Sequence, residues 1–336
     1  MTATSATRRS VPNLDRHGLL RQSLVGARLM DYLFRRLILF NAALAIGVIV
    51  LIFVYVGKES LPLLLSEDIQ QEVTVGKMFS SQPNETEELA LSYIWQPVSK
   101  EPKYSVIPLL LGSLKVTFIA LLFAAPLSIA AAIYTAEFAV PWVRELVKPI
   151  IELLAGIPSV VLGFLALVVL ASWLQHFFQF DYRLNAVNAG LAMGLAIIPI
   201  IYTVSEDALS SVPRSYREAS LALGVSPWKT ARSVVLPAAT PGIFAAMVLG
   251  FGRAVGETMI VLMASGNAAV TSLSLADSVR TVSATIAAEL GEVVFGSAHY
   301  HVLFFLGTML FILTFLLNMV GDVFVSRLKQ RMMGAS

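Results

Sequence analysis

Two charged residues, Arg253 and Glu257, stand in a long apolar run, GFGRAVGETMIVLMASG, at residues 250–266. A charged side chain at bilayer depth costs at least about 2.5 kcal/mol, so it usually has a partner or a function. If the run is one helix, a spacing of four places both side chains on the same face, where they can touch. Counted from Gly242 at about 1.5 Å per residue, Arg253 lies about 16 Å into the span.

Two interpretations of this pair stay open. In one, Arg253 and Glu257 form a structural ion pair that lowers the cost of burial. In the other, they contact a substrate in a water-accessible path, because arginine stays charged and its planar fork matches phosphate or carboxylate. Gly252 and Gly256, also four apart, are predicted to pack closely against a neighbouring helix.

Lys115 and Ser159 are weaker candidates for the same path. Lys115 lies about 12 Å into the second apolar run, and it either reaches outward to the membrane interface or adds positive potential to the path. Ser159 follows Gly156 and Pro158, which interrupt a helix and either kink it for packing or shape the path.

The other polar residues give little support for an intramembrane enzyme. The chain has no cysteine and four histidines, of which we expect His299 and His301 at the external surface. The predicted spans contain no paired aspartates, no His-x-x-x-His and no Gly-x-Ser-x-Gly elbow. We therefore expect no catalytic residue, no metal site and no cofactor bound by this chain.

The composition is that of an integral membrane protein. Of 336 residues, 57% are hydrophobic and 14% are charged, against about 25% charged in soluble domains. The net charge of +2 gives no indication of nucleic-acid binding. Six runs are long enough to cross a hydrocarbon core about 30 Å thick, which predicts an all-α protein with six transmembrane helices. They are residues 37–56, 107–135, 150–173, 186–205, 242–264 and 302–325.

Basic residues predict the orientation. Seven arginines precede Leu37, so the positive-inside rule places the N-terminus in the cytoplasm. Alternation of six spans then places the C-terminal residues 326–336 in the cytoplasm and the segment 57–105 outside. That external segment is long for a structureless connection, so we expect it to hold a short helix and a surface for a partner.

The N-terminal region 1–36 carries a regular arginine pattern. Arg21, Arg28 and Arg35 stand seven residues apart and therefore share a helical face. We predict that residues 19–36 form an amphipathic helix at the cytoplasmic interface of the membrane. An ordinary extension of the first span is the alternative.

The loop 206–241, between the fourth and fifth spans, predicts two short helices. Gly224 suits the left-handed position just past the end of the first helix. Ser226 and Pro227 suit the N-cap and first position of the second, which we expect Pro237 to end. Small and apolar side chains flanked by charges fit a groove on a partner. A helical hairpin packed on its own membrane domain is the alternative.

The spacing in this loop resembles the EAA loop of binding-protein-dependent ABC importer permeases. The matching positions are Glu218-Ala219, Gly224, Val234 and Leu236-Pro237, with Ser220 replacing the usual second Ala and Val234 the usual Ile. The resemblance implies the type I (MetI-like) permease fold over residues 106–325. It also implies a coupling helix that docks into a cleft on the cytosolic ATPase. The residues assigned to that coupling are Glu218, Ala219, Gly224, Leu223 and Arg217.

Three further stretches resemble permeases of the phosphate-specific transport (Pst) system, and its C subunit (PstC) more than its A subunit. They are GRAVGETM, ELLAGIPSVVLGF at 152–164 and ATIAAEL at 284–290. The resemblance implies phosphate passage at Arg253 and Glu257, in a bacterial inner membrane. The implied partners are a PstA-like permease, two PstB-like ATP-binding subunits and a PstS-like periplasmic phosphate-binding protein. ATP and Mg²⁺ are then bound by the ATPase subunits, and this chain is no enzyme.

Alternatives stay open at this point. They are a PstA-type subunit, a permease for another oxyanion, and, from different classes, an intramembrane enzyme or a passive channel. If phosphate is the substrate, the Glu257 carboxylate can accept its P–OH proton, which sulfate lacks; a buried unpaired contact costs about 1–3 kcal/mol. The alternative is that Glu257 merely orients Arg253.

Overall fold

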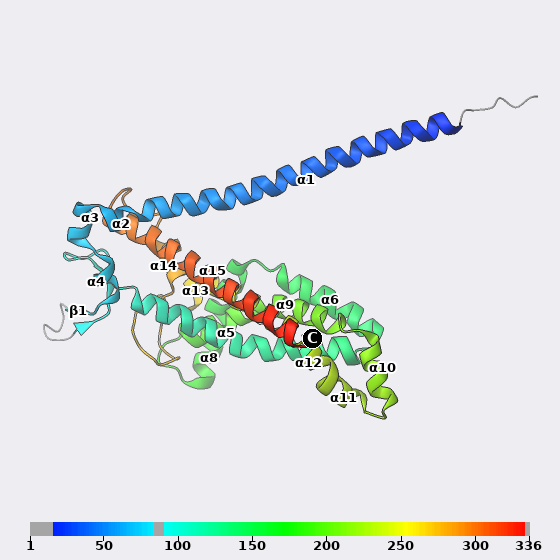
Figure 1. The fold of residues 1–336 in the computed structure, drawn as a ribbon. Coiled ribbons are helices and arrows are strands. Elements are labelled where there is room, and N and C mark those ends of the chain that lie inside the picture. The colour runs from blue at the N-terminus through cyan, green and yellow to red at the C-terminus, as the bar shows by residue number, and fades with distance from the viewer. Residues whose placement is uncertain (1–15, 84–90, 333–336) are drawn as a thin grey trace, which may run out of the picture. The chain divides into compact units, whose positions relative to one another are not determined.

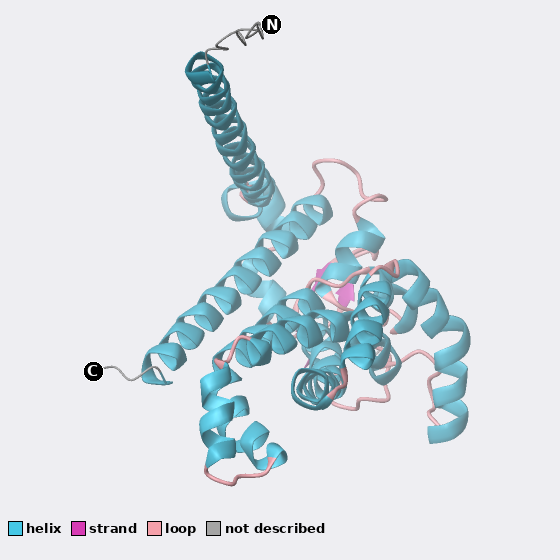
Figure 2. Ribbon diagram, turned by 90° about the vertical axis from the view of Figure 1, so that its right-hand side faces the viewer, coloured by secondary structure: helices cyan, strands magenta, loops and turns pink. Residues whose placement is uncertain are grey.

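The computed structural model describes residues 16–83 and 91–332 and divides into two units, Met1–Tyr55 and Val56–Ser336 (Figure 1). Its described part is mostly helical, and the strands found there are two residues long (Figure 2). Six helices in that part are long and apolar enough to cross a membrane, which confirms the predicted number. These are Met30–Leu65, Ile107–Phe138, Ser159–Phe178, Ala186–Ser210, Pro227–Val255 and Ala298–Arg327.

Helix α1 (Arg16–Ser60) makes up the described part of the first unit and continues into the second. It runs without a break through residues 19–36 and the predicted first span, which is the form expected of an extension of that span. The side chains of residues 16–29 lie outside the described residues, as do residues 1–15 and 333–336 at the two predicted cytoplasmic ends. The amphipathic interfacial helix therefore stays a prediction.

The third span begins later than predicted. Helix α6 (Pro141–Ala155) ends before the turn 156–158, and the span starts at Ser159. Its three parts are α7 (Ser159–Leu165), the π-helical turn η2 (Ala166–Leu170) and α8 (Ala171–Phe178). The predicted start at residue 150 was wrong because Pro158 fixes its own φ, has no N–H and disfavours a helical residue before it.

The fifth span begins earlier than predicted, at Pro227. Helix α11 (Pro227–Thr230), the π-helical turn η3 (Ala231–Val235) and α12 (Leu236–Val255) follow one another without a break. Pro237 was expected to end a helix but lies in the first turn of α12, where proline is tolerated. The wide turn of η3 leads into it, with the Leu236 N–H donating to the Ala231 carbonyl five residues earlier.

Three spans of the second unit pack closely through glycines. They are α5 (Ile107–Ile133), α9 (Ala186–Ser210) and α12. A Cβ added at Gly190 of α9 would lie 2.6 Å from Cβ of Ile119 of α5, and one at Gly250 of α12 would lie 2.7 Å from Cγ1 of Ile201 of α9. Even a methyl group therefore cannot enter between these helices without displacing them. Small residues allow this close approach of membrane helices.

The described residues of the segment 57–105 form a small folded body of short elements. They are α2 (Pro62–Leu65), α3 (Glu67–Glu72), α4 (Val75–Phe79), and the antiparallel pairs β1 (Gln82–Pro83) with β2 (Leu91–Ser92) and β3 (Trp95–Gln96) with β4 (Lys103–Tyr104). The expected short helix is thus present. Apolar residues of the segment share a core with the start of α5, with α14 (Val282–Glu289) and with the start of α15 (Ala298–Met332).

Two short helices follow α9, as predicted: α10 (Arg214–Ala222) and α11, which continues into the fifth span; we call residues 214–235 the knob. Gly224 is left-handed, with φ of +79°, and the Ser226 hydroxyl caps α11 by accepting from the Lys229 N–H at 3.4 Å, which confirms both assignments. Helix α5 starts beside the segment 57–105 and leads, through the π-helical turn η1 (Tyr134–Phe138), to the knob. We call these the far end and the knob end.

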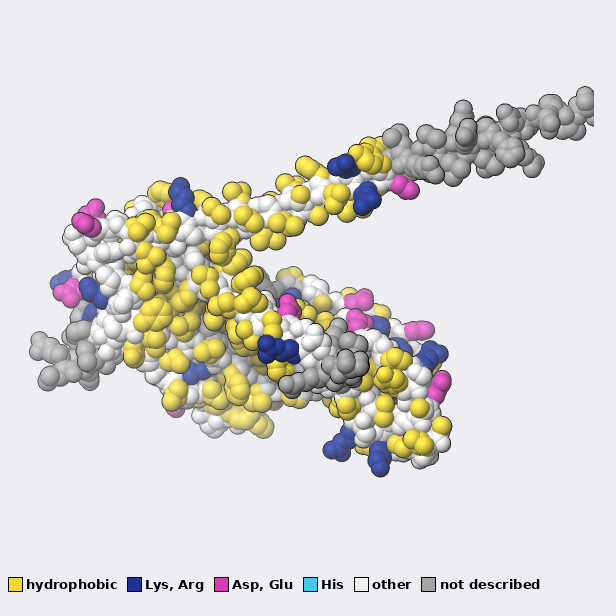
Figure 3. Space-filling view, viewed as in Figure 1, with side chains coloured by type: hydrophobic (Ala, Val, Ile, Leu, Met, Phe, Trp, Pro, Cys, Tyr) yellow, Lys and Arg dark blue, Asp and Glu magenta, His cyan; other side chains and the backbone are white. Residues whose placement is uncertain are grey.

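Charged and apolar side chains are distributed differently between the middle of the second unit and its two ends. On the face of the second unit seen in Figure 3, apolar side chains cover much of the middle, and charged side chains gather at the two ends. This is the distribution expected of a bundle that crosses a hydrocarbon layer.

Candidate functional site

The site predicted around Arg253 and Glu257 lies at an interruption of the fifth span. Helix α12 ends at Val255, residues 256–258 form a turn, and α13 (Met259–Ala264) follows. Arg253 is in the last turn of α12, where the helix dipole favours a cation. Glu257 is outside both helices, so the prediction that the two side chains share one helical face was wrong.

Arg253 and Glu257 do not form an ion pair. The Glu257 carboxylate accepts the Thr258 N–H at 3.2 Å through Oε1, and its backbone carbonyl accepts the Ser283 hydroxyl at 2.7 Å. The Arg253 side chain is exposed and has no hydrogen bond or ion pair to any residue in 16–83 or 91–332. This conformation therefore does not contain the structural ion pair between Arg253 and Glu257.

An open pocket adjoins the interruption. Its volume is about 520 Å³, and its lining residues come from the turn, from α14 and from the start of the following loop and α15: Gly256, Thr258, Ser283, Ile286, Ala287, Leu290, Gly291 and Leu310. The lining is largely apolar with few hydroxyl and backbone polar groups. Backbone that leaves the helix at membrane depth is tolerated where it is covered by protein or lines a water-filled space.

Two predicted packing glycines have different surroundings. A Cβ added at Gly252 would lie 3.3 Å from Oδ1 of Asn318, so α12 and α15 approach each other there. At Gly256 an added Cβ would meet only backbone carbonyls of its own chain turn, those of Gly252 and Arg253. Gly256 therefore caps α12, and a Cβ added there would contact no neighbouring helix.

Lys115 and Ser159 have different surroundings. The Lys115 ammonium donates to the Ser274 carbonyl at 2.9 Å, in the loop between α13 and α14. Its two interpretations both stay predictions. Ser159 is the half-buried first residue of α7. One turn later, a Cβ at Gly163 would lie 3.1 Å from the Met259 carbonyl, so α7 packs directly against the segment after the interruption.

The far end contains a polar cluster that the sequence did not predict. The Glu289 carboxylate accepts the Trp95 indole N–H at 3.1 Å, pairs with Arg280 at 2.6 Å and contacts His299 Nε2 at 2.9 Å. Burial alone raises the pKa of Glu289, but the hydrogen bonds from His299 and Trp95 and the charge of Arg280 together bring it below its ordinary value. The carboxylate is thus the ionised centre of the cluster.

The expectation that His299 and His301 lie at the surface was wrong. His299 binds Glu289, and His301 is 8% exposed with its Nδ1 2.7 Å from the Glu59 carbonyl. His299 thus attaches α15 to the end of α14, and His301 attaches it to Glu59, 242 positions earlier. Nearby, burial and a hydrogen bond to Glu72 raise the pKa of Tyr104, so this phenol stays a donor.

The knob exposes most of the residues predicted to contact a partner. Glu218 and Ala219 are exposed, Gly224 has open space around its Cα, and Leu223 is 84% exposed. Trp228 adds a second exposed apolar side chain. Large apolar side chains at the tip of a charged loop are typical of a docking surface.

Comparison with known families decides what kind of protein carries this knob. The family described as "Binding-protein-dependent transport system inner membrane component" matches residues 126–334, which is more than half of the chain. The chain belongs to this family. It is therefore a multi-pass membrane protein and a permease subunit of an ABC importer.

Relatives agree with that assignment. "Probable ABC transporter permease protein YqgH" of Bacillus subtilis is 38% identical over 242 residues, covering 72% of this chain and 78% of the relative. "Phosphate transport system permease protein PstC" of Mesorhizobium japonicum is 32% identical over 256 residues, covering 70% and 77%. These relatives are transporter permease subunits, which agrees with the prediction that the chain itself is no enzyme.

Solved structures show the same fold. A bacterial alginate ABC transporter in complex with its periplasmic protein matches with a TM-score of 0.57 at 16% identity, over 90% of this chain and 99% of that one. The MetNI methionine ABC transporter in inward-facing conformations matches with a TM-score of 0.50 at 21% identity, over 66% and 94%. The predicted type I, MetI-like permease fold is thereby confirmed.

In this importer permease, Arg217 differs from the other predicted coupling residues. Its guanidinium does not point outward but binds Glu137 of η1, with Nη2 to Oε1 at 2.7 Å. The sequence analysis missed Glu137 and Glu206. Both belong to a second polar cluster, which lies at the knob end. The available signal was an acidic residue close after each of the apolar runs 107–135 and 186–205. Among the described residues, no group of three or more His, Asp or Glu side chains could hold a metal ion.

Proposed function

We propose that this permease imports inorganic phosphate as the PstC-type subunit of a Pst system. The observation that carries the proposal is Arg253: a guanidinium within a membrane span, unpaired among the described residues, beside an interruption of the helix and an open pocket. An unpaired cation at membrane depth is costly unless it faces water or an anion. Several relatives that share about a third of their residues are named phosphate permeases.

The partners follow from the same proposal. A PstS-like periplasmic protein delivers phosphate at the far end, a PstA-like permease completes the path, and two PstB-like subunits bind ATP and Mg²⁺ and dock on the knob. The knob and both termini then lie in the cytoplasm, and the segment 57–105 lies in the periplasm of the bacterial inner membrane. ATP binding favours one of two conformations of the permease pair, and this differential binding drives alternating access.

Arg253 and Glu257 have separate tasks in this scheme. Arg253 supplies the charge for the oxyanion. Glu257 uses Oε1 to accept the Thr258 N–H, and Oε2 stays available as an acceptor for a P–OH group. Sulfate lacks that proton and would oppose a carboxylate with acceptors only, which leaves an unsatisfied buried contact costing about 1–3 kcal/mol.

The test is uptake into proteoliposomes that contain the complete complex and receive the loaded binding protein. We expect Arg253→Gln to abolish ATP-dependent phosphate uptake while the ATPase subunits still co-purify, and Glu145→Gln, which alters an exposed carboxylate with no partner in the described residues, to leave uptake unchanged. Wild-type uptake by Arg253→Gln would contradict the proposal. Phosphate flux through a complex without ATPase subunits would indicate a passive channel instead.

The role of Glu257 needs its own comparison. Glu257→Gln retains the size of the side chain but replaces one acceptor oxygen with a donor. We expect it to lower phosphate uptake and to let sulfate compete. Normal phosphate uptake with sulfate still excluded would remove the selectivity role and favour the interpretation that Glu257 only positions the backbone of the turn.

A further inference from the structure

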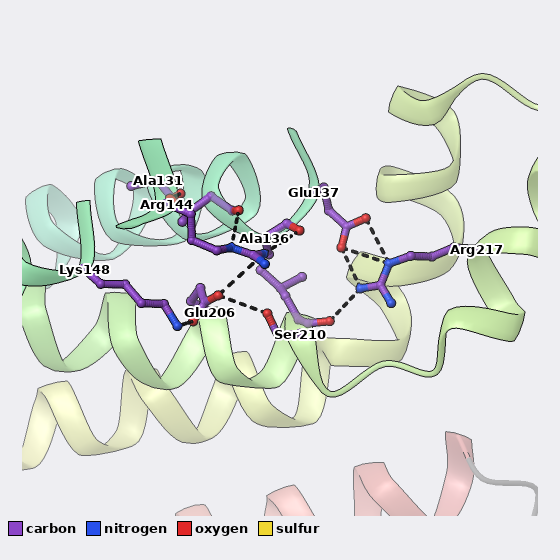
Figure 4. A network of polar contacts seen from close by, with 10 residues as sticks. Ala131, Ala136, Glu137, Arg144, Lys148, Glu206, Ser210 and Arg217 are labelled. Carbon is purple, nitrogen blue, oxygen red and sulfur yellow. Dashed lines mark hydrogen bonds and ion pairs between the residues drawn. The ribbon is translucent and has the colours of Figure 1, made fainter. Parts of the chain in front are cut away.

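Arg217 connects the knob to two transmembrane helices. Its Nη2 and Nε bind the Glu137 carboxylate at 2.7 and 3.1 Å, which joins α10 to η1 at the end of α5. The same guanidinium donates to the carbonyls of Leu209 and Val212, where α9 ends. Figure 4 shows the Arg217 guanidinium facing the Glu137 carboxylate. A planar fork can hold such an arrangement, whereas a lysine ammonium cannot reproduce it.

A second buried carboxylate, Glu206 of α9, lies beside this contact. It is 3% exposed and accepts from Lys148 of α6 at 3.0 Å and from the Ser210 hydroxyl at 3.0 Å. Arg144 of α6 lies 3.8 Å from the same carboxylate and donates to the Thr135 and Ala136 carbonyls of η1. We call these charged residues the knob-end node: Glu137, Arg144, Lys148, Glu206 and Arg217 (Figure 4).

The node ties the knob to a rigid part of the membrane domain. Helices α5, α9 and α12 are packed through glycines so closely that they leave no room for a methyl group between them. Close-packed interiors transmit displacement rather than absorbing it. Gly250, which touches Ile201 of α9, stands one turn before Arg253 on α12. A displacement of α9 at the node is therefore delivered to the helix that carries Arg253.

We propose that the Glu137–Arg217 ion pair is the link through which movement of the knob is carried into the transmembrane helices. Arg217 is then a positioning residue inside the permease, and the ATPase is contacted by the exposed knob residues. The proposal rests on the proposed function, because it assumes that an ATPase moves the knob. A ring contact between Phe138 of η1 and Trp228 of α11, 5.9 Å between centroids, is a second, weaker link at the same place.

The first experiment compares Glu137→Gln and Arg217→Gln in the complete transporter. We expect both variants to co-purify with the ATPase subunits and to hydrolyse ATP, while the phosphate transported per ATP falls about tenfold, within the range typical of coupling between distant sites. The matched control is Glu145→Gln, which removes a neighbouring carboxylate without a partner in the described residues.

A covalent link tests whether the pair acts as a tether. The chain has no cysteine, so the double variant Glu137→Cys with Arg217→Cys introduces its only thiols. A bis-methanethiosulfonate cross-linker that matches the length of the pair should restore phosphate transport per ATP, and a reductant should abolish it again. The wild-type complex treated with the same reagent controls for cysteines of the partner subunits.

A readout that needs no phosphate separates this proposal from the proposed function. Thr258→Cys places a thiol in the pocket beside the interrupted helix. We expect ATP to change its labelling rate in the otherwise unchanged complex, and Glu137→Gln to abolish that change. Absence of phosphate uptake by the wild-type complex, with the labelling response intact, would contradict phosphate import but support the link.

Three results would overturn the link. One is normal transport per ATP in both single variants. Another is loss of ATPase binding in Arg217→Gln but not in Glu137→Gln, which would make Arg217 a direct contact of the ATPase. The third concerns the labelling rate of Thr258→Cys. The link is overturned if ATP does not change this rate in the otherwise wild-type complex, or if ATP still changes it when Glu137→Gln is also present.

Discussion

The two ends of the membrane domain each contain a largely buried carboxylate with basic partners, but they are built differently. At the far end, Glu289 lies among Trp95, Arg280 and His299, and the side chains of all four are mostly buried. At the knob end, Glu206 is buried but its partners Arg144 and Lys148 are 40% and 47% exposed.

The difference indicates different tasks. At the far end, largely buried partners hold the described part of the segment 57–105 against α14 and α15 in one arrangement. Long cationic side chains that extend from solvent keep their contact while the elements around them shift, because they have many rotamers. We interpret the far end as a fixed clasp and the knob-end node as a moving link.

The largest effect is expected at the far end. Glu289→Leu leaves Arg280 and His299 buried without their carboxylate, and breaking a buried pair by removing one partner costs about 3–5 kcal/mol. We expect a marked fall in the apparent melting temperature in detergent and rapid proteolysis between residues 57 and 105. A melting temperature equal to that of the wild type would show that the cluster does not hold the segment.

Acidification should break the same clasp less completely. Because the pKa of Glu289 is lowered in the folded protein, its stabilising contribution is present above the ordinary value of 4.5 and is lost as the pH falls below it. The melting temperature should therefore fall more steeply below pH 4.5 in the wild type than in Glu289→Gln. Parallel pH curves for the two proteins would contradict the ionised state assigned to Glu289.

Glu206→Gln should separate stability from coupling. Its cationic partners are solvent-exposed and can rehydrate, so we expect a cost of about 1 kcal/mol, near the upper end for exposed pairs. The amide can still accept one hydrogen bond from Lys148. Transport per ATP should nevertheless fall measurably in proteoliposomes. A large loss of thermal stability without a change in coupling would reverse the comparison between the two ends.

The smallest effect is expected inside the knob. The Ser220 and Thr230 hydroxyls, both buried, lie 2.9 Å apart and join α10 to α11. Ser220→Ala, which supplies the residue more usual in the EAA loop, should cost about 1 kcal/mol of knob stability and leave transport intact. Hydrogen exchange of the knob amides would measure it; loss of transport would give this contact a larger role than the structure indicates.

The sequence predicted those features that depend on local pattern. Gly224 and Ser226 have the conformations expected of them because a helix end and a helix cap are decided by a few adjacent residues. Six apolar runs likewise predicted six spans. The predictions for Pro237 and Gly256 were wrong. The conformation at Pro237 depends on the π-helical turn before it, and the packing at Gly256 depends on the contacts of the turn around it.

The charged clusters could not be predicted in the same way. Trp95 and Glu289 are 194 positions apart, and Arg217 and Glu137 are 80 positions apart. No spacing rule relates such residues, because they meet only once the helices have packed. Arg253 was found because a charge in an apolar run is visible locally, whereas the interruption beside it was not.

The length of α1 has a consequence for how the protein can be reached by soluble molecules. Its 45 residues form a rod about 68 Å long at 1.5 Å per residue. Even at a tilt of about 40°, crossing the lipid tails takes only about 39 Å of such a rod. The rest of the helix must lie in the headgroup region or in water, where proteases, chaperones or antibodies can bind it without entering the bilayer.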